Sequence, residues 1–283
     1  MKITCNLYDQ WLDGIRQEMT QANFAHEKLS AQECVISFFS WKRRSVSSGK
    51  RRVQKSSCFN CPSHLQKGLT DLEKAFETGG NIWPWQSKRI DNRSFEDGMF
   101  NDFGVMHFHL GIGFEQNGYI NRDGALLFAI VDSTAIYEIG IYSHKDWYEL
   151  DLLNIVDENW PDLLNTVTIN VLDVTNYPST CDEVKALREA KVNSVIRLKS
   201  GRIVAPLGGG VVTNGTSNDA VRSAQNWTRI LQDGEKAIIS DIKEQIQKGK
   251  MESKDYEILL HTTDDEISGI LPEGYKWILW KKT

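Results

Sequence analysis

The runs VMHFHLG (residues 105–111), ALLFAIVD (125–132) and AIYEIGIYSH (135–144) decide the fold of the middle of this chain. Each run is short and rich in β-branched and aromatic residues, which favours strands. The first gap contains Asn-Gly and Asp-Gly dipeptides, and the second is an Asp-Ser-Thr turn. Consecutive strands joined by turns pair antiparallel, so the pattern predicts a small β-meander.

Helical and strand-like segments flank the meander on both sides. Apolar residues recur at helical spacing in four segments, which are residues 9–38, 63–78, 146–165 and 218–248. Strand-like runs return in three others, which are TINVLDV (168–174), a hairpin at 194–207 and the tail 256–282. We therefore predict an α+β fold in three parts, which are an N-terminal helical region with a basic segment (1–62), an α+β core (63–160) and a C-terminal α+β domain (161–283).

The composition is that of a folded protein without a membrane segment. Of the 283 residues, 40% are hydrophobic, which is enough for a sizeable core. The N-terminus has no apolar signal core, and charges interrupt every long window. Five cysteines, an odd number, in a chain without a signal peptide indicate reduced thiols. We expect a cytoplasmic protein with no membrane partner.

The basic residues are concentrated near the N-terminus, although the net charge is −5. Residues 1–55 carry ten Lys and Arg against five Asp and Glu. Most of these bases lie in KRRSVSSGKRRVQK (42–55). Such a run is more often a solvated loop or helix face, but it also suits contacts to RNA phosphates. The candidate nucleic-acid-binding residues are Lys42, Arg43, Arg44, Lys50, Arg51 and Arg52.

The first strand of the meander carries two histidines. Alternate side chains share a face of a strand, so Met106, Phe108 and Leu110 form one face, which we expect to be the core side. His107 and His109 then lie side by side on the opposite face, which we expect to be less buried.

The third strand carries another polar set. Tyr137, Ile139 and Ile141 are expected on its core side, which leaves Glu138, Gly140, Tyr142 and His144 opposite. If the strands pair in one sheet, His144 converges on His107 and His109, and Arg122 enters from the loop before the middle strand. The alternative is an ordinary polar solvent face of a half-exposed sheet.

Two chemistries suit three clustered histidines. Three imidazoles can bind zinc and leave a position open for water. Without a metal, one imidazole can accept a proton while another donates one, and an arginine can stabilise charge on a phosphate. Those groups are sufficient to cleave RNA through attack of its own 2′-hydroxyl.

The segment NRDGALLFAIVDSTAIYEIGIYSH (121–144) resembles the C-terminal meander of RelE-type toxin ribonucleases. The matching features, in order, are Arg122, the LLFAIVD strand, the Asp132 turn and the strand end with Tyr142, His144 and Lys145. The resemblance covers only the middle of the chain. It implies a ribonuclease that acts on RNA and is neutralised by a protein antitoxin. From the histidine chemistry we expect no cofactor. Arg122 would bind the scissile phosphate, and His144 would act as acid or base.

Our leading hypothesis is a toxin-like ribonuclease with metal-independent catalysis. The candidate catalytic residues are His107, His109, Arg122 and His144, with Tyr142 and Lys145 as auxiliaries. One alternative is a non-catalytic protein-binding module of a mobile-element or phage-defence system. Another is a zinc-dependent hydrolase that uses the three histidines.

Overall fold

The computed structural model describes residues 1–92, 95–170 and 177–282. It confirms the α+β class, since helices accompany sheets with both parallel and antiparallel pairs. The predicted strand over residues 168–174 lies partly outside the described residues; within them, Thr168 forms an isolated bridge to Val204. The described residues contain no helix long and apolar enough to cross a membrane.

The chain divides into two compact units, and the predicted boundaries near 62 and 160 do not match this division. One unit combines residues 1–39 with the chain from Ala220 onward, and the other is Ser40–Asp219. The physical reason is that a strand near the N-terminus pairs in parallel with one near the C-terminus, from Ile3 opposite Tyr256 to Cys5 opposite Ile258. Local periodicity cannot reveal a contact so distant in sequence.

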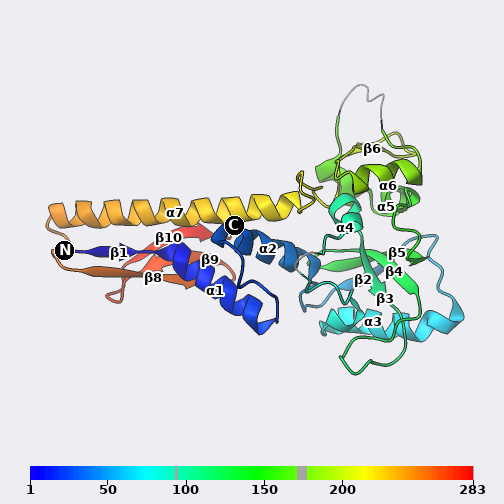
Figure 1. The fold of residues 1–283 in the computed structure, drawn as a ribbon, viewed down its shortest axis with the longest axis horizontal. Helices are drawn as coiled ribbons and strands as arrows, with labels where there is room; N and C mark the ends of the chain where they lie inside the picture. Colours follow the sequence, from blue (N-terminus) through cyan, green and yellow to red (C-terminus); the bar gives the residue numbers. More distant parts are fainter. Residues whose placement is uncertain (93–94, 171–176, 283) are drawn as a thin grey trace. The chain divides into compact units, whose positions relative to one another are not determined.

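The first unit is a sheet covered by a long helix. Its sheet has the order β1-β8-β9-β10. The helix α7 runs along this sheet (Figure 1) and approaches it closely at Gly234, where a Cβ would lie 2.6 Å from Leu279 Cδ2. Its elements are β1 (Ile3–Cys5), α1 (Leu7–Gln21), α2 (Ala31–Arg44), α7 (Asn218–Gln247), β8 (Tyr256–Thr262), β9 (Glu266–Ile270) and β10 (Lys276–Lys281). The last residues of α2 and the first residues of α7 belong to the second unit. Thus the helix predicted over 9–38 is two helices.

The second unit contains the predicted meander. Its elements are β2 (Arg52–Lys55), η1 (Ser63–Leu65), α3 (Gln66–Thr78), η2 (Trp83–Trp85), α4 (Gly98–Phe103), β3 (Met106–His109), β4 (Ala125–Val131), β5 (Ala135–Ser143), α5 (Asp151–Asn159), η3 (Pro161–Val167), α6 (Cys181–Glu189), β6 (Ile196–Arg197) and β7 (Ile203–Val204). The strands β3, β4 and β5 pair antiparallel in sequence order, as expected. The strand β2 adds in parallel beside β5, so the sheet order is β2-β5-β4-β3.

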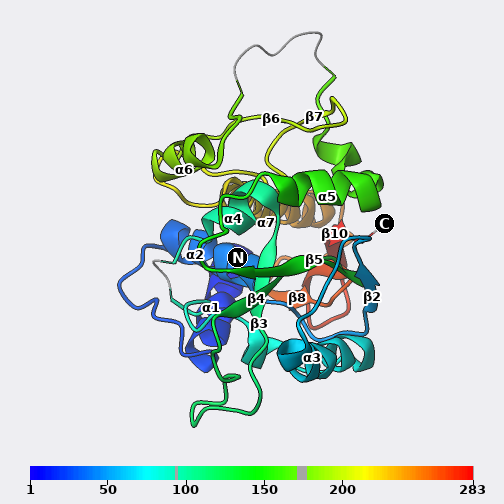
Figure 2. The ribbon, with the colours of Figure 1, turned by 90° about the vertical axis from the view of Figure 1, so that its right-hand side faces the viewer.

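Helices cover both faces of this second sheet, as Figure 2 shows. The α3 face packs Met106, Phe108 and Leu127 against the apolar stripe of α3. The α5 face packs Leu126 and Phe128 against α5, with α4 and α6 contributing to the same core. Both faces of the sheet are therefore covered. Successive side chains along a strand enter two different hydrophobic cores, one on the α3 face and one on the α5 face, rather than a core and solvent.

A β-bulge changes the phase of β5. The register shifts between Phe128, opposite Gly140, and Ala129, opposite Glu138. Beyond the bulge the side chains exchange faces. Ile139 therefore packs on the α5 face and Ile141 packs on the α3 face. The expectation that Glu138 shares a face with Tyr142 and His144 is wrong for this reason.

Candidate functional site

Three imidazoles converge on the α5 face of the second sheet. The ring centroids of His107 and His109 lie 5.9 Å apart, and those of His109 and His144 lie 5.8 Å apart. The pairing explains the convergence. His107 is opposite Phe128 and His109 is opposite Leu126, so both imidazoles share the face of the α5 core.

The two strand histidines are buried, which corrects the expected less buried face. His107 is 7% exposed and His109 is 6% exposed, whereas His144 is exposed. The prediction failed because the α5 core covers a face that would be solvated in a half-exposed sheet. The cluster therefore runs from one exposed imidazole inward to two buried ones.

The turn after β5 positions His144. The Asp146 carboxylate accepts hydrogen bonds from Ser143 N at 2.8 Å and Ser143 Oγ at 2.9 Å, which closes the turn. Trp147 follows, and its ring lies edge-on to His107 at 4.7 Å and contacts His144 at 5.9 Å. Trp147 thus connects the innermost and the exposed imidazole.

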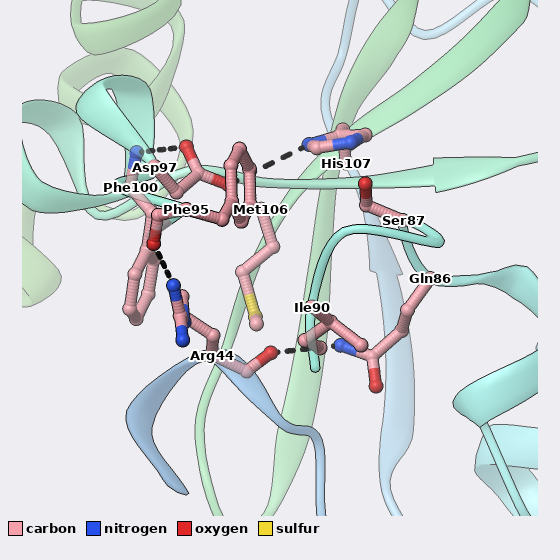
Figure 3. Close-up of a pocket in the computed structure, with 9 residues that line it drawn as sticks. All are labelled: Arg44, Gln86, Ser87, Ile90, Phe95, Asp97, Phe100, Met106 and His107. Carbon is pink, nitrogen blue, oxygen red and sulfur yellow. Dashed lines mark hydrogen bonds and ion pairs between the residues drawn. The ribbon is translucent and has the colours of Figure 1, made fainter. Parts of the chain in front are cut away.

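A small pocket lies at the free edge of β3 (Figure 3). Its volume is about 20 Å³, which is room for one water molecule. The Asp97 carboxylate stands 3.8 Å from His107 Nδ1, too far for a direct hydrogen bond, and also caps α4 by accepting from Phe100 N. The lining residues are Arg44, Gln86, Ser87, Ile90, Phe95, Asp97, Phe100, Met106 and His107.

Arg122 supplies cationic donors near the same imidazoles. Its Nη2 donates to Gln86 O at 3.0 Å, and its guanidinium lies over the Tyr119 ring at 5.3 Å. The buried Nε and Nη1 atoms of Arg122 have no hydrogen-bond partner among the described residues. Within that part of the chain the Nδ1 atoms of His107 and His109 are also buried without a partner. Several donors and acceptors of the cluster are thus both buried and without a hydrogen-bond partner in the described residues.

The electrostatics of the cluster keep its innermost imidazole neutral. Burial, with smaller contributions from the charges of His144 and Arg122, lowers the pKa of His107 to about 4. Burial also lowers the pKa of Arg122 and raises that of Asp97. The groups surrounding His107 therefore favour the arrival of negative charge.

The two predicted auxiliaries lie at the margin of the cluster. Tyr142 stacks on Phe128 with centroids 4.8 Å apart, and burial raises the pKa of its hydroxyl to about 12. Its proton is therefore held too tightly for acid catalysis near neutral pH. Lys145 is exposed at the turn, where its backbone N–H donates to Ser143 Oγ.

The basic run is partly built into the fold. Arg44 and Arg51 are buried and donate to backbone carbonyls, of Phe95 and of Asp132 respectively, so the interpretation of a fully solvated run is wrong for both. Arg43 donates to Gly208 O at 2.6 Å and to Asn101 Oδ1 at 3.1 Å. The exposed basic residues of the run are Lys42, Lys50, Arg52 and Lys55.

The donor arrangement does not favour the zinc alternative. No group of three or more His, Cys, Asp or Glu side chains in residues 1–92, 95–170 and 177–282 is arranged to hold a metal ion. A zinc site of this kind needs three side-chain donors at about 2 Å from one ion.

Sequence reasoning missed Asp97 and the central role of Trp147. Asp97 is the N-cap of the short helix α4. An aspartate directly before the segment GMFNDF is a helix-start signal, so the sequence could have predicted this role. Nothing in the local pattern places that cap beside β3. Trp147 directly follows the turn that carries His144, but its contact with His107 depends on the sheet register.

No protein-family model matches this chain, and comparisons with curated proteins and with solved structures found no match. The function must therefore be argued from the chemistry of the site alone.

Proposed function

We propose that the chain is a toxin-like ribonuclease that cleaves RNA without a metal ion. The observation that carries the proposal is the cluster of three imidazoles beside a guanidinium with two buried, unpartnered N–H donors in the described part of the chain. A buried polar donor without a partner costs about 1–3 kcal/mol, and a ligand that pairs with it would offset this cost. A phosphodiester offers the oxygens that such a guanidinium binds.

The proposed phosphate position is next to Arg122. Its Nη2 is fixed by Gln86 O, and its ring contact with Tyr119 holds the guanidinium plane, so the remaining donors are presented in a defined direction. A guanidinium fork stabilises the charge that builds on non-bridging phosphate oxygens in the transition state.

The imidazoles supply proton transfer. His144 is exposed and can reach the substrate, and His109 lies directly behind it. In the proposed reaction, a base removes the proton of the 2′-hydroxyl, and the 2′-oxygen then forms a bond to phosphorus. The bond from phosphorus to the 5′-oxygen breaks, and an acid protonates that oxygen. The products are a 2′,3′-cyclic phosphate and a free 5′-hydroxyl.

Substrate binding would change the charge of the site. The positive neighbours of His107 lower its pKa in the free protein, so it carries no proton near neutral pH. A bound phosphate adds negative charge beside Arg122 and raises the pKa of the imidazoles. Substrate binding would then favour protonation of His107.

The experiment is an RNA cleavage assay with excess chelator. We expect single-stranded RNA to be cut to products with 2′,3′-cyclic phosphate ends, and a 2′-deoxy substitution at the cleaved position to block the reaction. If chelation abolishes cleavage, a zinc hydrolase is the better description. If the purified chain cleaves no RNA but forms a stoichiometric complex with a protein, it is a binding module. A toxin of this kind would also need a protein antitoxin as partner.

A further inference from the structure

The connection between β3 and β4 forms a folded arm beyond the sheet. It carries two large apolar side chains in solvent, Ile112 at 50% exposure and Phe114 at 63%. Backbone hydrogen bonds close the arm, from Glu115 N to Tyr119 O at 2.7 Å and from Asn121 N to Gly113 O at 3.0 Å. Phe114 is therefore exposed on an ordered backbone rather than on a loose loop.

Close backbone packing holds the base of this arm. A Cβ at Gly111 would lie 1.8 Å from Asn121 O, so only glycine allows the two chains to approach so closely. Phe114 forms an isolated bridge with the buried Ile120, which continues the antiparallel pairing. The ring of Phe114 thus keeps a fixed place relative to the residues that follow Ile120, including Arg122.

Aromatic contacts connect the arm to the phosphate-binding arginine. Trp83 and Tyr119 have ring centroids 4.0 Å apart, and the guanidinium of Arg122 lies over the same Tyr119 ring. Trp85, in the same short helix as Trp83, contacts Phe114 edge-on with centroids 6.3 Å apart. An aromatic series therefore runs from Arg122 to the exposed ring of Phe114.

Cationic side chains accompany this aromatic series. Lys88 and Arg89 follow the short helix and are both exposed. Lys88 forms an ion pair with Glu115, which ties the arm to this turn, and Arg89 lies over the Phe95 ring. Aromatic rings interleaved with cations are typical of surfaces that bind single-stranded nucleic acids, because bases stack on rings while phosphates pair with the cations.

We infer that the arm is a base-stacking platform for single-stranded RNA, with Phe114 as the ring on which a base next to the scissile phosphate stacks. The inference rests on the proposed ribonuclease function and adds the substrate class. In a duplex the base faces are occupied by their neighbours, so only unpaired nucleotides can use an exposed ring. Stacking on a ring is tolerant of sequence, and we therefore expect little base preference from Phe114 itself.

The test measures RNA affinity in a full-length chain that carries His144→Ala to prevent cleavage. Fluorescence anisotropy with labelled oligouridine compares Phe114→Ala, Phe114→Trp and Ile112→Ala in that background. We expect Phe114→Ala to weaken binding about tenfold, since one base–ring stack has that order of effect. Phe114→Trp should restore affinity, and Ile112→Ala, an exposed aliphatic residue of the same arm, should leave it unchanged. A duplex of the same length should bind independently of residue 114.

The outcomes separate the platform from the chemistry. Unchanged affinity of Phe114→Ala, or equal losses for single-stranded and duplex RNA, overturns the platform even if the chain with His144 intact cleaves RNA. Binding that depends on Phe114 without any cleavage supports the platform and overturns the proposed ribonuclease. A chain that binds no oligouridine overturns both.

Discussion

The two faces of the second sheet bury ionisable groups in opposite ways. On the α3 face, Glu138 is fully buried in the middle of β5, and burial, together with the negative charge of Glu73, raises its pKa to about 8. On the α5 face, burial and two positive neighbours lower the pKa of His107 to about 4. Burial is the main reason that both groups are neutral at neutral pH, and the neighbouring charges that add to it are negative for Glu138 and positive for His107.

The carboxyl cluster contains its own partners. Lys55 pairs with Glu138 in the β2–β5 register, and its Nζ lies 2.8 Å from Glu73 Oε1. A protonated Glu138 can donate to the Glu73 carboxylate, so one shared proton and one lysine complete the cluster. The histidine cluster has one carboxylate neighbour, Asp97, whose Oδ2 lies 3.8 Å from His107 Nδ1 and whose pKa is raised by burial. Both clusters contain buried atoms without a hydrogen-bond partner among the described residues, including both carboxyl oxygens of Glu138. The difference is that a lysine lies beside the carboxyl pair, whereas the histidine cluster contains the guanidinium that we propose as the phosphate-binding group.

The largest expected effect is on catalysis. Replacing the exposed imidazole, His144→Ala, should lower RNA cleavage by roughly 10²–10⁴, the usual contribution of a positioned acid or base. His64→Ala is the matched control, because His64 is also an exposed histidine of the second unit, on η1, and should cleave normally. Equal rates for the two variants in a single-turnover assay would contradict the assignment of His144.

A smaller loss should follow from altering the phosphate clamp. Arg122→Lys keeps the positive charge but removes the planar fork, so we expect single-turnover cleavage to fall by roughly 10–100-fold. Arg197→Lys is the control, since Arg197 is exposed on β6 of the same unit and is not a candidate RNA contact. A loss in both variants would show that replacing an arginine elsewhere in this unit has the same effect, and would count against a specific phosphate contact by Arg122.

The buried carboxyl group of Glu138 should make the stability of the protein depend on pH. A folded-state pKa of about 8 lies above the ordinary value of 4.5, so folding favours the protonated form of Glu138 and wild-type stability falls as pH rises between these values. Glu138→Gln should remove this dependence and gain on the order of 3–4 kcal/mol relative to wild type between pH 4.5 and about pH 9. Denaturant unfolding at several pH values measures it, and RNA cleavage should not change. Parallel pH profiles for the two proteins would be inconsistent with a neutral Glu138.

The histidine face should show the opposite and somewhat smaller dependence. Because the pKa of His107 is lowered from 6.5 to about 4, the unfolded chain takes up a proton that the folded chain refuses, and stability falls as pH drops through this range. His107→Gln should reduce this loss of unfolding free energy at acid pH by up to roughly 3 kcal/mol. The same series of unfolding measurements tests this prediction. If wild type and the variant lose the same stability as pH falls, His107 is protonated in the folded protein.

Sequence patterns predicted most local structure and the residues of the cluster, but not their environment. The meander, the helix over 218–247 and the C-terminal strands follow from periodicity and turn residues. The convergence of His107, His109 and His144 follows from alternation in paired strands. Their burial, the bulge that turns Glu138 to the other face and the contact of Asp97 with β3 depend on tertiary packing, which a single sequence does not encode locally.

The most direct test of the account is the pKa of His107 with and without bound nucleic acid. Histidine ring signals can be followed by NMR against pH, with His107→Gln for assignment, in the free protein and with a 2′-deoxy oligouridine that cannot be cleaved. We predict a pKa of about 4 for His107 in the free protein. Bound nucleic acid should raise this pKa by at least about one unit, because its negative phosphates oppose the positive charges of His144 and Arg122. A pKa that the oligonucleotide leaves unchanged at saturation would contradict an anion site on the histidine face.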